Sequence, residues 1–279
     1  MIWVRDDLGS TFAGLAFDDF LRLGQELVRI GPDGARRTAW FERAGQRFYV
    51  KAHTGVGWRE ILKSWLQLKR AVVDALPEAR ALRRLEELGI PGARLAAHGV
   101  EGANPARRRS FVITESLENT EDLAEWLARQ GPLAPGWRGA LARALGGIAG
   151  RLHGARLAHQ DLYLTHFRIR LAPGGGFELF LIDLHRALPA RAGSRRWRLK
   201  DLAALRFSTL ALPVSRSDCA RFLRAYRARP KTSARNLQSA ESSRRTPLRS
   251  DSCNAACEWR RAPGRAAWAR RGRHDDARL

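Results

Sequence analysis

The chain has 279 residues, of which 44% are hydrophobic, so it can bury a substantial core and is not a wholly disordered polymer. Its 50 Lys and Arg residues against 28 Asp and Glu residues give a net charge of +22, which predicts an anionic partner such as nucleic acid, an acidic membrane surface, a phosphorylated substrate or an acidic protein. The three cysteines form no CxxC pair, and no run reaches the roughly 18 apolar residues that span a bilayer, so we expect a protein of the reducing cytosol that is soluble or lies on a surface.

Residues 26–53 predict an antiparallel meander. Three runs with strand character, ELVRIG, TAWFER and RFYVKAH, are separated by the turn sequences PDGARR and AGQ. Because side chains alternate along a strand, Tyr49 and Lys51 share one face of the last run and Phe48 and Val50 share the other.

Residues 57–73, GWREILKSWLQLKRAVV, predict a basic amphipathic helix, since Trp58, Leu62 and Trp65 recur at helical spacing. We expect this apolar stripe to pack on the preceding strands, with docking on a membrane surface as the alternative. A second helix is expected from Pro77 to about Gly89, followed by the strands ARLAAHGV and RSFVITESL.

From residue 118 the sequence is mostly helical, so the prediction is an α+β, bilobal fold. Its expected parts are a β-rich lobe at 1–117 and a helical lobe at 118–228. Residues 229–279 have no sustained apolar period and carry 13 basic against 5 acidic residues, which predicts a disordered basic tail. A frame shift in GC-rich DNA is a further hypothesis for this tail.

The segment HQDLYLTH, residues 159–166, carries the chemistry that kinases place in a catalytic loop. His159 and Asp161 match the first two positions of the pattern H-x-D-x-x-x-x-N, and Asp161 is the candidate catalytic base. His166 occupies the asparagine position, where it would bind metal, orient the loop or contact a phosphate. Asp183 in LFLIDLH ends an apolar run, as the metal-binding Asp of Asp-Phe-Gly does, and oxygen ligands suit Mg²⁺.

Several residues of the first lobe are candidates for ATP binding. Lys51 is the candidate phosphate lysine, and Glu78 is its favoured partner over Glu86 and Glu87. The turn PDGARR lacks a Gly-rich loop, so Arg36 and Arg37 are expected to supply phosphate contacts instead. Glu115 lies where the chain passes between lobes, so we expect the backbone of residues 115–117 to contact adenine, or the Glu115 side chain to contact ribose.

The strings RRT, FYVKAH, SFVITESL, HQDLYLTHF, LIDLHRA and RRWRLKDLAALRFST, in this order, resemble the lipopolysaccharide core heptose(I) kinase family of the WaaP or RfaP type over residues 20–228. The resemblance implies a protein-kinase-like fold that transfers phosphate from ATP, with Mg²⁺, to the first inner-core heptose at the cytoplasmic face of the inner membrane. It implies Asp161 as base, Lys51 with Glu78 as the phosphate-anchoring pair, and Asp183 as the Mg²⁺ ligand. It also implies that Asp201 braces the catalytic loop.

The implied partners are the densely anionic lipid A and inner core, an anionic membrane surface and, as a further candidate, an acidic protein such as acyl carrier protein. Three alternatives remain. One is a related kinase for another sugar or small molecule, the second is a catalytically inactive basic binding protein, and the third is a nucleic-acid binder. No nucleic-acid motif is recognisable in the sequence, which argues against specific nucleic-acid binding.

Overall fold

The computed structural model describes residues 1–30, 34–66, 72–189 and 195–228. The predicted disordered tail at 229–279 lies outside the described residues. Among the described helices, none is both long enough and apolar enough to cross a bilayer.

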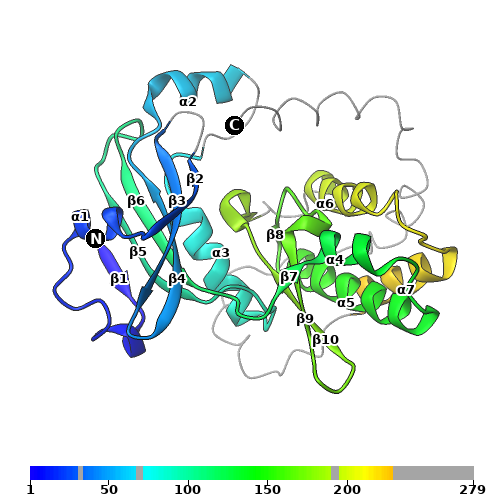
Figure 1. Cartoon of the computed structure of the whole chain (residues 1–279). Helices are drawn as coiled ribbons and strands as arrows, with labels where there is room; N and C mark the ends of the chain where they lie inside the picture. The colour runs from blue at the N-terminus through cyan, green and yellow to red at the C-terminus, as the bar shows by residue number, and fades with distance from the viewer. Residues whose placement is uncertain (31–33, 67–71, 190–194, 229–279) are drawn as a thin grey trace, which may run out of the picture.

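The N-terminal lobe is built on a six-stranded antiparallel sheet (Figure 1). The strand order is β1-β5-β6-β4-β3-β2. The strands are β1 (Ile2–Val4), β2 (Glu26–Ile30), β3 (Arg36–Arg43), β4 (Gln46–His53), β5 (Leu95–Glu101) and β6 (Arg109–Glu115). The predicted meander over β2, β3 and β4 is therefore confirmed, and positive φ angles at Ala44 and Gly45 make the tight turn between β3 and β4.

Helices of this lobe pack on the sheet, except α2, which projects beyond its end. The short η1 (Asp6–Leu8) and α1 (Phe17–Arg22) close one face of the sheet, where Phe20 stacks on Phe111 with ring centroids 4.6 Å apart. Helix α3 (Leu76–Glu87) begins with Pro77 in its first turn, as predicted, and its buried residues join the core of the C-terminal lobe. Helix α2 (Gly57–Leu66) projects beyond the end of the sheet (Figure 1).

The C-terminal lobe is mostly helical (Figure 1). Its helices are α4 (Leu123–Gln130), α5 (Pro135–Gly154), α6 (Arg195–Ser208) and α7 (Arg216–Arg227), with the 3-10 turns η2 (Leu164–His166) and η3 (Leu184–Arg186). Its short strands form two small sheets: β7 (Glu121–Asp122), β9 (Phe167–Leu171) and β10 (Phe177–Leu181) in one, and β8 (Leu157–Ala158) with β11 (Leu188–Pro189) in the other. The predicted α+β class, with a β-rich first part and a helical second part, is confirmed.

Helices α5 and α7 approach each other closely because α5 carries glycines at the contact. A Cβ atom added to Gly150 would lie 2.5 Å from the backbone oxygen of Tyr226, and one added to Gly146 would collide with the backbone oxygen of Phe222. A Cβ added to Gly147, on another side of the same helix, would meet no atom within 4 Å.

We therefore expect Gly150→Ala to lower the free energy of unfolding by about 1–3 kcal/mol, because α7 must move away from α5. Gly147→Ala is the matched control and is expected to raise it by about 0.5–1 kcal/mol through helix propensity alone. Urea titration of the three proteins measures the difference. Equal midpoints for the two variants would contradict the close approach.

Candidate active site

Three charged side chains from distant parts of the chain converge between the lobes. The Nζ atom of Lys51 on β4 lies 2.7 Å from Oε1 of Glu78 on α3 and 3.2 Å from Oδ1 of Asp183, which follows β10. Glu78 is buried, whereas Lys51 and Asp183 are partly exposed. The predicted pairing of Lys51 with Glu78, rather than with Glu86 or Glu87, is confirmed.

The electrostatics of this cluster fix its charge state. Burial alone would lower the pKa of Lys51, but the carboxylates of Glu78 and Asp183 raise that pKa above its ordinary value. Burial alone would likewise raise the pKa of Asp183, but the hydrogen bond from His185 Nδ1, 2.6 Å away, and the charge of Lys51 lower it overall. Lys51 is therefore protonated and Asp183 ionised throughout the neutral range.

Asp183 has a left-handed backbone conformation that directs its side chain toward Lys51. Its φ of 59° and ψ of 58° lie in the left-handed region, which Asp tolerates better than most residues, and the chain turns there from β10 into η3. The apolar run that precedes Asp183 forms the buried strand β10, as its sequence predicts.

Asp161 lies in the loop between β8 and η2, and its carboxylate is flanked by two cations. Arg186 Nη1 lies 3.1 Å from Asp161 Oδ2, and Lys200 Nζ lies 3.5 Å from Oδ1. These two partners of Asp161 are not among the residues predicted from the sequence. Both belong to strings that carry the family resemblance, Arg186 to LIDLHRA and Lys200 to RRWRLKDLAALRFST.

Asp201 on α6 is fully buried and accepts hydrogen bonds from the backbone of the catalytic loop. Its carboxylate accepts the backbone N–H of His159 at 2.8 Å and that of Gln160 at 2.7 Å, and it lies 3.1 Å from His153 Nε2. The bracing role that the family resemblance implies for Asp201 is thus confirmed. Gln160 has a φ of 72°, and these bonds stabilise that unusual conformation.

The two histidines of the loop are stacked, with ring centroids 5.5 Å apart. His159 Nε2 bonds the backbone oxygen of Ile182 at 3.0 Å, and burial lowers the pKa of His159, so this ring is neutral and ties the loop to the strand before Asp183. His166 Nδ1 bonds the backbone oxygen of Asp161 at 2.5 Å, and His166 Nε2 lies 3.5 Å from Asp183 Oδ2. His166 therefore bridges the segment of Asp161 to Asp183.

The donor atoms permit a test of the predicted Mg²⁺ site. No group of three or more His, Cys, Asp or Glu side chains suited to a metal is found within the described residues. Mg²⁺ commonly takes one or two carboxylates and completes its ligands with substrate phosphates and water, so the ionised carboxylate of Asp183 fits it. The nitrogen of His166 suits Mg²⁺ less well.

Arg36 and Arg37 lie on opposite faces of the sheet. Because β3 already includes both residues, they alternate: Arg36 is paired with His53 and shares the face of Lys51, whereas Arg37 is paired with Ala52 on the core face. Arg37 donates to the backbone oxygens of Leu21 and Leu23 at the end of α1. The prediction of a phosphate contact by Arg37 is therefore wrong.

On the Lys51 face, three buried nitrogen atoms have no hydrogen-bond partner among the described residues: Arg36 Nε and His53 Nδ1 near Lys51, and His98 Nδ1 on β5. Burial and the charge of Arg36 lower the pKa of His53 to about 4, so His53 is neutral. The sequence analysis missed His53, although alternation with Lys51 places it on the same face.

Glu115 occupies the end of β6 with its side chain directed away from the Lys51 face. It pairs with Phe48 of the core face in the strand register, and its carboxylate binds Arg5, with Arg94 at 3.7 Å. The Ser116 N–H bonds the backbone oxygen of Arg47 at 2.9 Å. The predicted ribose contact of the Glu115 side chain is wrong, because the sheet turns that side chain toward Arg5.

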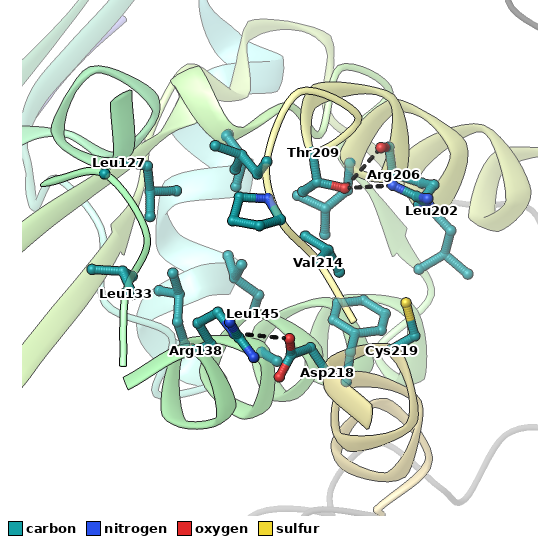
Figure 2. Close-up of a pocket in the computed structure, with 18 residues that line it drawn as sticks. Leu127, Leu133, Arg138, Leu145, Leu202, Arg206, Thr209, Val214, Asp218 and Cys219 are labelled. Carbon is teal, nitrogen blue, oxygen red and sulfur yellow. Dashed lines mark hydrogen bonds and ion pairs between the residues drawn. The ribbon is translucent and has the colours of Figure 1, made fainter. Parts of the chain in front are cut away.

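A separate apolar cavity lies within the C-terminal lobe among α4, α5, α6 and α7 (Figure 2). Leucines dominate its walls, and the polar side chains Arg138 and Asp218 at its edge pair with each other at 3.2 Å. None of the predicted site residues lines this cavity. The cavity is therefore separate from the cluster around Lys51, Asp161 and Asp183.

Comparison with known proteins identifies relatives for most of the chain. The model of the lipopolysaccharide kinase (Kdo/WaaP) family matches residues 22–226. The chain is 42% identical over 202 residues to lipopolysaccharide core heptose(I) kinase WaaP of Pseudomonas aeruginosa, covering 70% of this chain and 75% of that protein. It is 32% identical over 206 residues to 3-deoxy-D-manno-octulosonic acid kinase of Xanthomonas axonopodis, covering 69% and 76%.

Among solved structures, the chain resembles WaaP in complex with acyl carrier protein. The TM-score is 0.68 at 33% identity, and the match covers 82% of this chain and 90% of that chain. The likeness confirms the predicted fold class.

Proposed function

Because the chain belongs to the lipopolysaccharide kinase (Kdo/WaaP) family, we propose that it transfers the γ-phosphate of ATP to the first heptose of the lipopolysaccharide inner core. The observation that carries this proposal is the convergence of Lys51, Glu78 and Asp183 opposite a braced Asp161. The identity of 42% to a heptose(I) kinase, against 32% to a 3-deoxy-D-manno-octulosonic acid kinase, favours heptose as the acceptor.

In the proposed reaction this chain acts by positioning and charge. Lys51, held by Glu78, donates to the phosphates of ATP, and Arg36 supplies a further cation from the same sheet face. Asp183 holds Mg²⁺, which when bound neutralises charge on the phosphate oxygens. His166 keeps the loop at a fixed distance from Asp183.

Asp161 orients the heptose hydroxyl and accepts its proton as the oxygen attacks the γ-phosphorus, and the bond from that phosphorus to the bridging oxygen breaks to release ADP. Arg186 and Lys200 flank the Asp161 carboxylate, so the acceptor approaches through a cationic rim. This rim suits an anionic acceptor such as the inner core with lipid A.

We further propose that the chain works at the cytoplasmic face of the inner membrane, where the lipid-anchored acceptor lies, as a peripheral protein. The relative solved with acyl carrier protein supports that small acidic protein as a second partner, and the net charge of +22 suits it.

The direct test is transfer of labelled γ-phosphate from ATP with Mg²⁺ to lipopolysaccharide that lacks inner-core phosphate, using the full chain. A parallel acceptor that ends at 3-deoxy-D-manno-octulosonic acid and lacks heptose separates the two relatives' activities. Label on the heptose acceptor alone supports the proposal. Label on the truncated acceptor at an equal rate contradicts the heptose assignment.

Lys51→Met is expected to lower kcat/KM for ATP on the order of 10²-fold, because a preorganised cation is removed from the phosphates. Arg80→Met is the matched control, since Arg80 is exposed on the same helix as Glu78 and both residue types favour helices. Steady-state kinetics with varied ATP measure the effect. Equal values for Lys51→Met and the wild type would rule out the phosphate role.

A further inference from the structure

The apolar stripe of α2 faces away from the molecule. Trp58, Leu62, Trp65 and Leu66, at positions i, i+4, i+7 and i+8, share one side of the helix, and their exposed fractions are 55%, 55%, 75% and 87%. The sequence-based expectation that this stripe packs on the sheet is therefore wrong for the described part of the helix. Such a patch on a soluble monomer commonly marks a site of interaction.

The helix is nevertheless firmly attached at its first turn. The Gly57 N–H bonds the backbone oxygen of Ala106 at 2.9 Å, and Val56 is buried. Gly55 has a φ of 102° and lies so close to Ala106 and Arg107 that a Cβ atom there would collide with their backbone. The first turn of α2 is thus held against the loop of Ala106 and Arg107, and Figure 1 shows α2 projecting from the lobe.

Basic residues lie beside the stripe. Arg59 and Lys63 are exposed on α2 itself, and exposed Arg107 lies beside its base. Glu60, the acidic residue of α2, lies 3.8 Å from Lys63.

We propose that this docking face, Trp58, Leu62, Trp65 and Leu66 with Arg59, Lys63 and Arg107, inserts into the interfacial layer of an anionic membrane. Tryptophan and leucine on one side of a helix and basic residues beside them are the composition that binds at the boundary of headgroups and acyl chains. A second copy of this chain is disfavoured as the occupant, because its own net charge of +22 and the same arginine and lysine would oppose it.

The inference rests on the proposed function for placing the chain at a membrane, but it concerns binding and not catalysis. Helices α2 and α6 both lie toward the upper side of Figure 1, one in each lobe.

The test is cosedimentation of the full chain with vesicles of phosphatidylcholine mixed with phosphatidylglycerol, and with vesicles of phosphatidylcholine alone. Binding to the mixed vesicles is expected to fall about tenfold for each of Trp58→Gln and Trp65→Gln, and Leu62→Gln is expected to weaken it in the same direction. Leu171→Gln is the matched control and should bind like the wild type, since Leu171 is equally apolar and 50% exposed on β9.

The proposal is overturned if the double variant Trp58→Gln/Trp65→Gln binds the mixed vesicles as tightly as the wild type. It is also overturned if the wild type is a dimer that these substitutions dissociate without changing vesicle binding. Phosphate transfer to detergent-dispersed acceptor is measured in parallel and should be the same for all variants. If the wild type transfers no phosphate, the proposed function is contradicted, but the vesicle assay still tests the docking face.

Discussion

Asp161→Asn is expected to lower kcat by about 10²–10⁴-fold, the effect of removing a positioned acid–base group. The substitution keeps the shape of the side chain and its proximity to Arg186 and Lys200, but an amide cannot take the proton from the acceptor hydroxyl. Single-turnover transfer of labelled phosphate measures the chemical step without product release. The KM for ATP should change little, because Lys51 and Asp183 remain in place.

Asp122→Asn serves as the matched control, because Asp122 is a carboxylate whose role is to cap α4 in the same lobe. A modest change in stability is expected there, with no change in the transfer step. Turnover by Asp161→Asn close to that of the wild type would show that Asp161 is not the catalytic base.

Asp201→Asn is expected to lower the free energy of unfolding by about 1–3 kcal/mol, the cost of leaving a buried donor without its acceptor. Both carboxylate oxygens accept hydrogen bonds, Oδ1 from Gln160 N–H and Oδ2 from His159 N–H and the His153 ring. An amide has one oxygen, so its NH₂ group must face a backbone N–H. Two donors then point at each other, and neither has an acceptor.

Urea denaturation measures this loss, with Asp6→Asn as the isosteric control because Asp6 is exposed in η1. Residual folded protein should also lose transfer activity, since the loop of Asp161 is no longer held. A variant with an unchanged denaturation midpoint would show that the loop is supported by other contacts.

Motif order and spacing in the sequence predict Lys51, Glu78 and Asp183, whereas the brace at Asp201 is implied by the family resemblance. The local pattern around each residue indicates the strand, helix or loop that carries it. Tertiary pairing over long separations was not accessible in the same manner. Glu115 binds Arg5, 110 residues away, and no local pattern announces that partner.

Two other differences have simple physical causes. Strand β3 begins at Arg36, earlier than its composition indicates, and alternation then separates Arg37 from the phosphate side. The period of α2 locates an apolar stripe but carries no information on what covers it, because a buried helix and an interfacial helix have the same pattern.

Under the proposed function, the contact of Lys51 with both Glu78 and Asp183 makes nucleotide entry an exchange of anions. An oxygen of the triphosphate takes the place of the Asp183 carboxylate at the Lys51 ammonium, while Glu78 stays paired with that ammonium. Small polyanions such as pyrophosphate therefore compete for the free enzyme at the same ammonium group. An adenosine analogue without phosphate offers no anion for this exchange and leaves the bridge between the lobes intact.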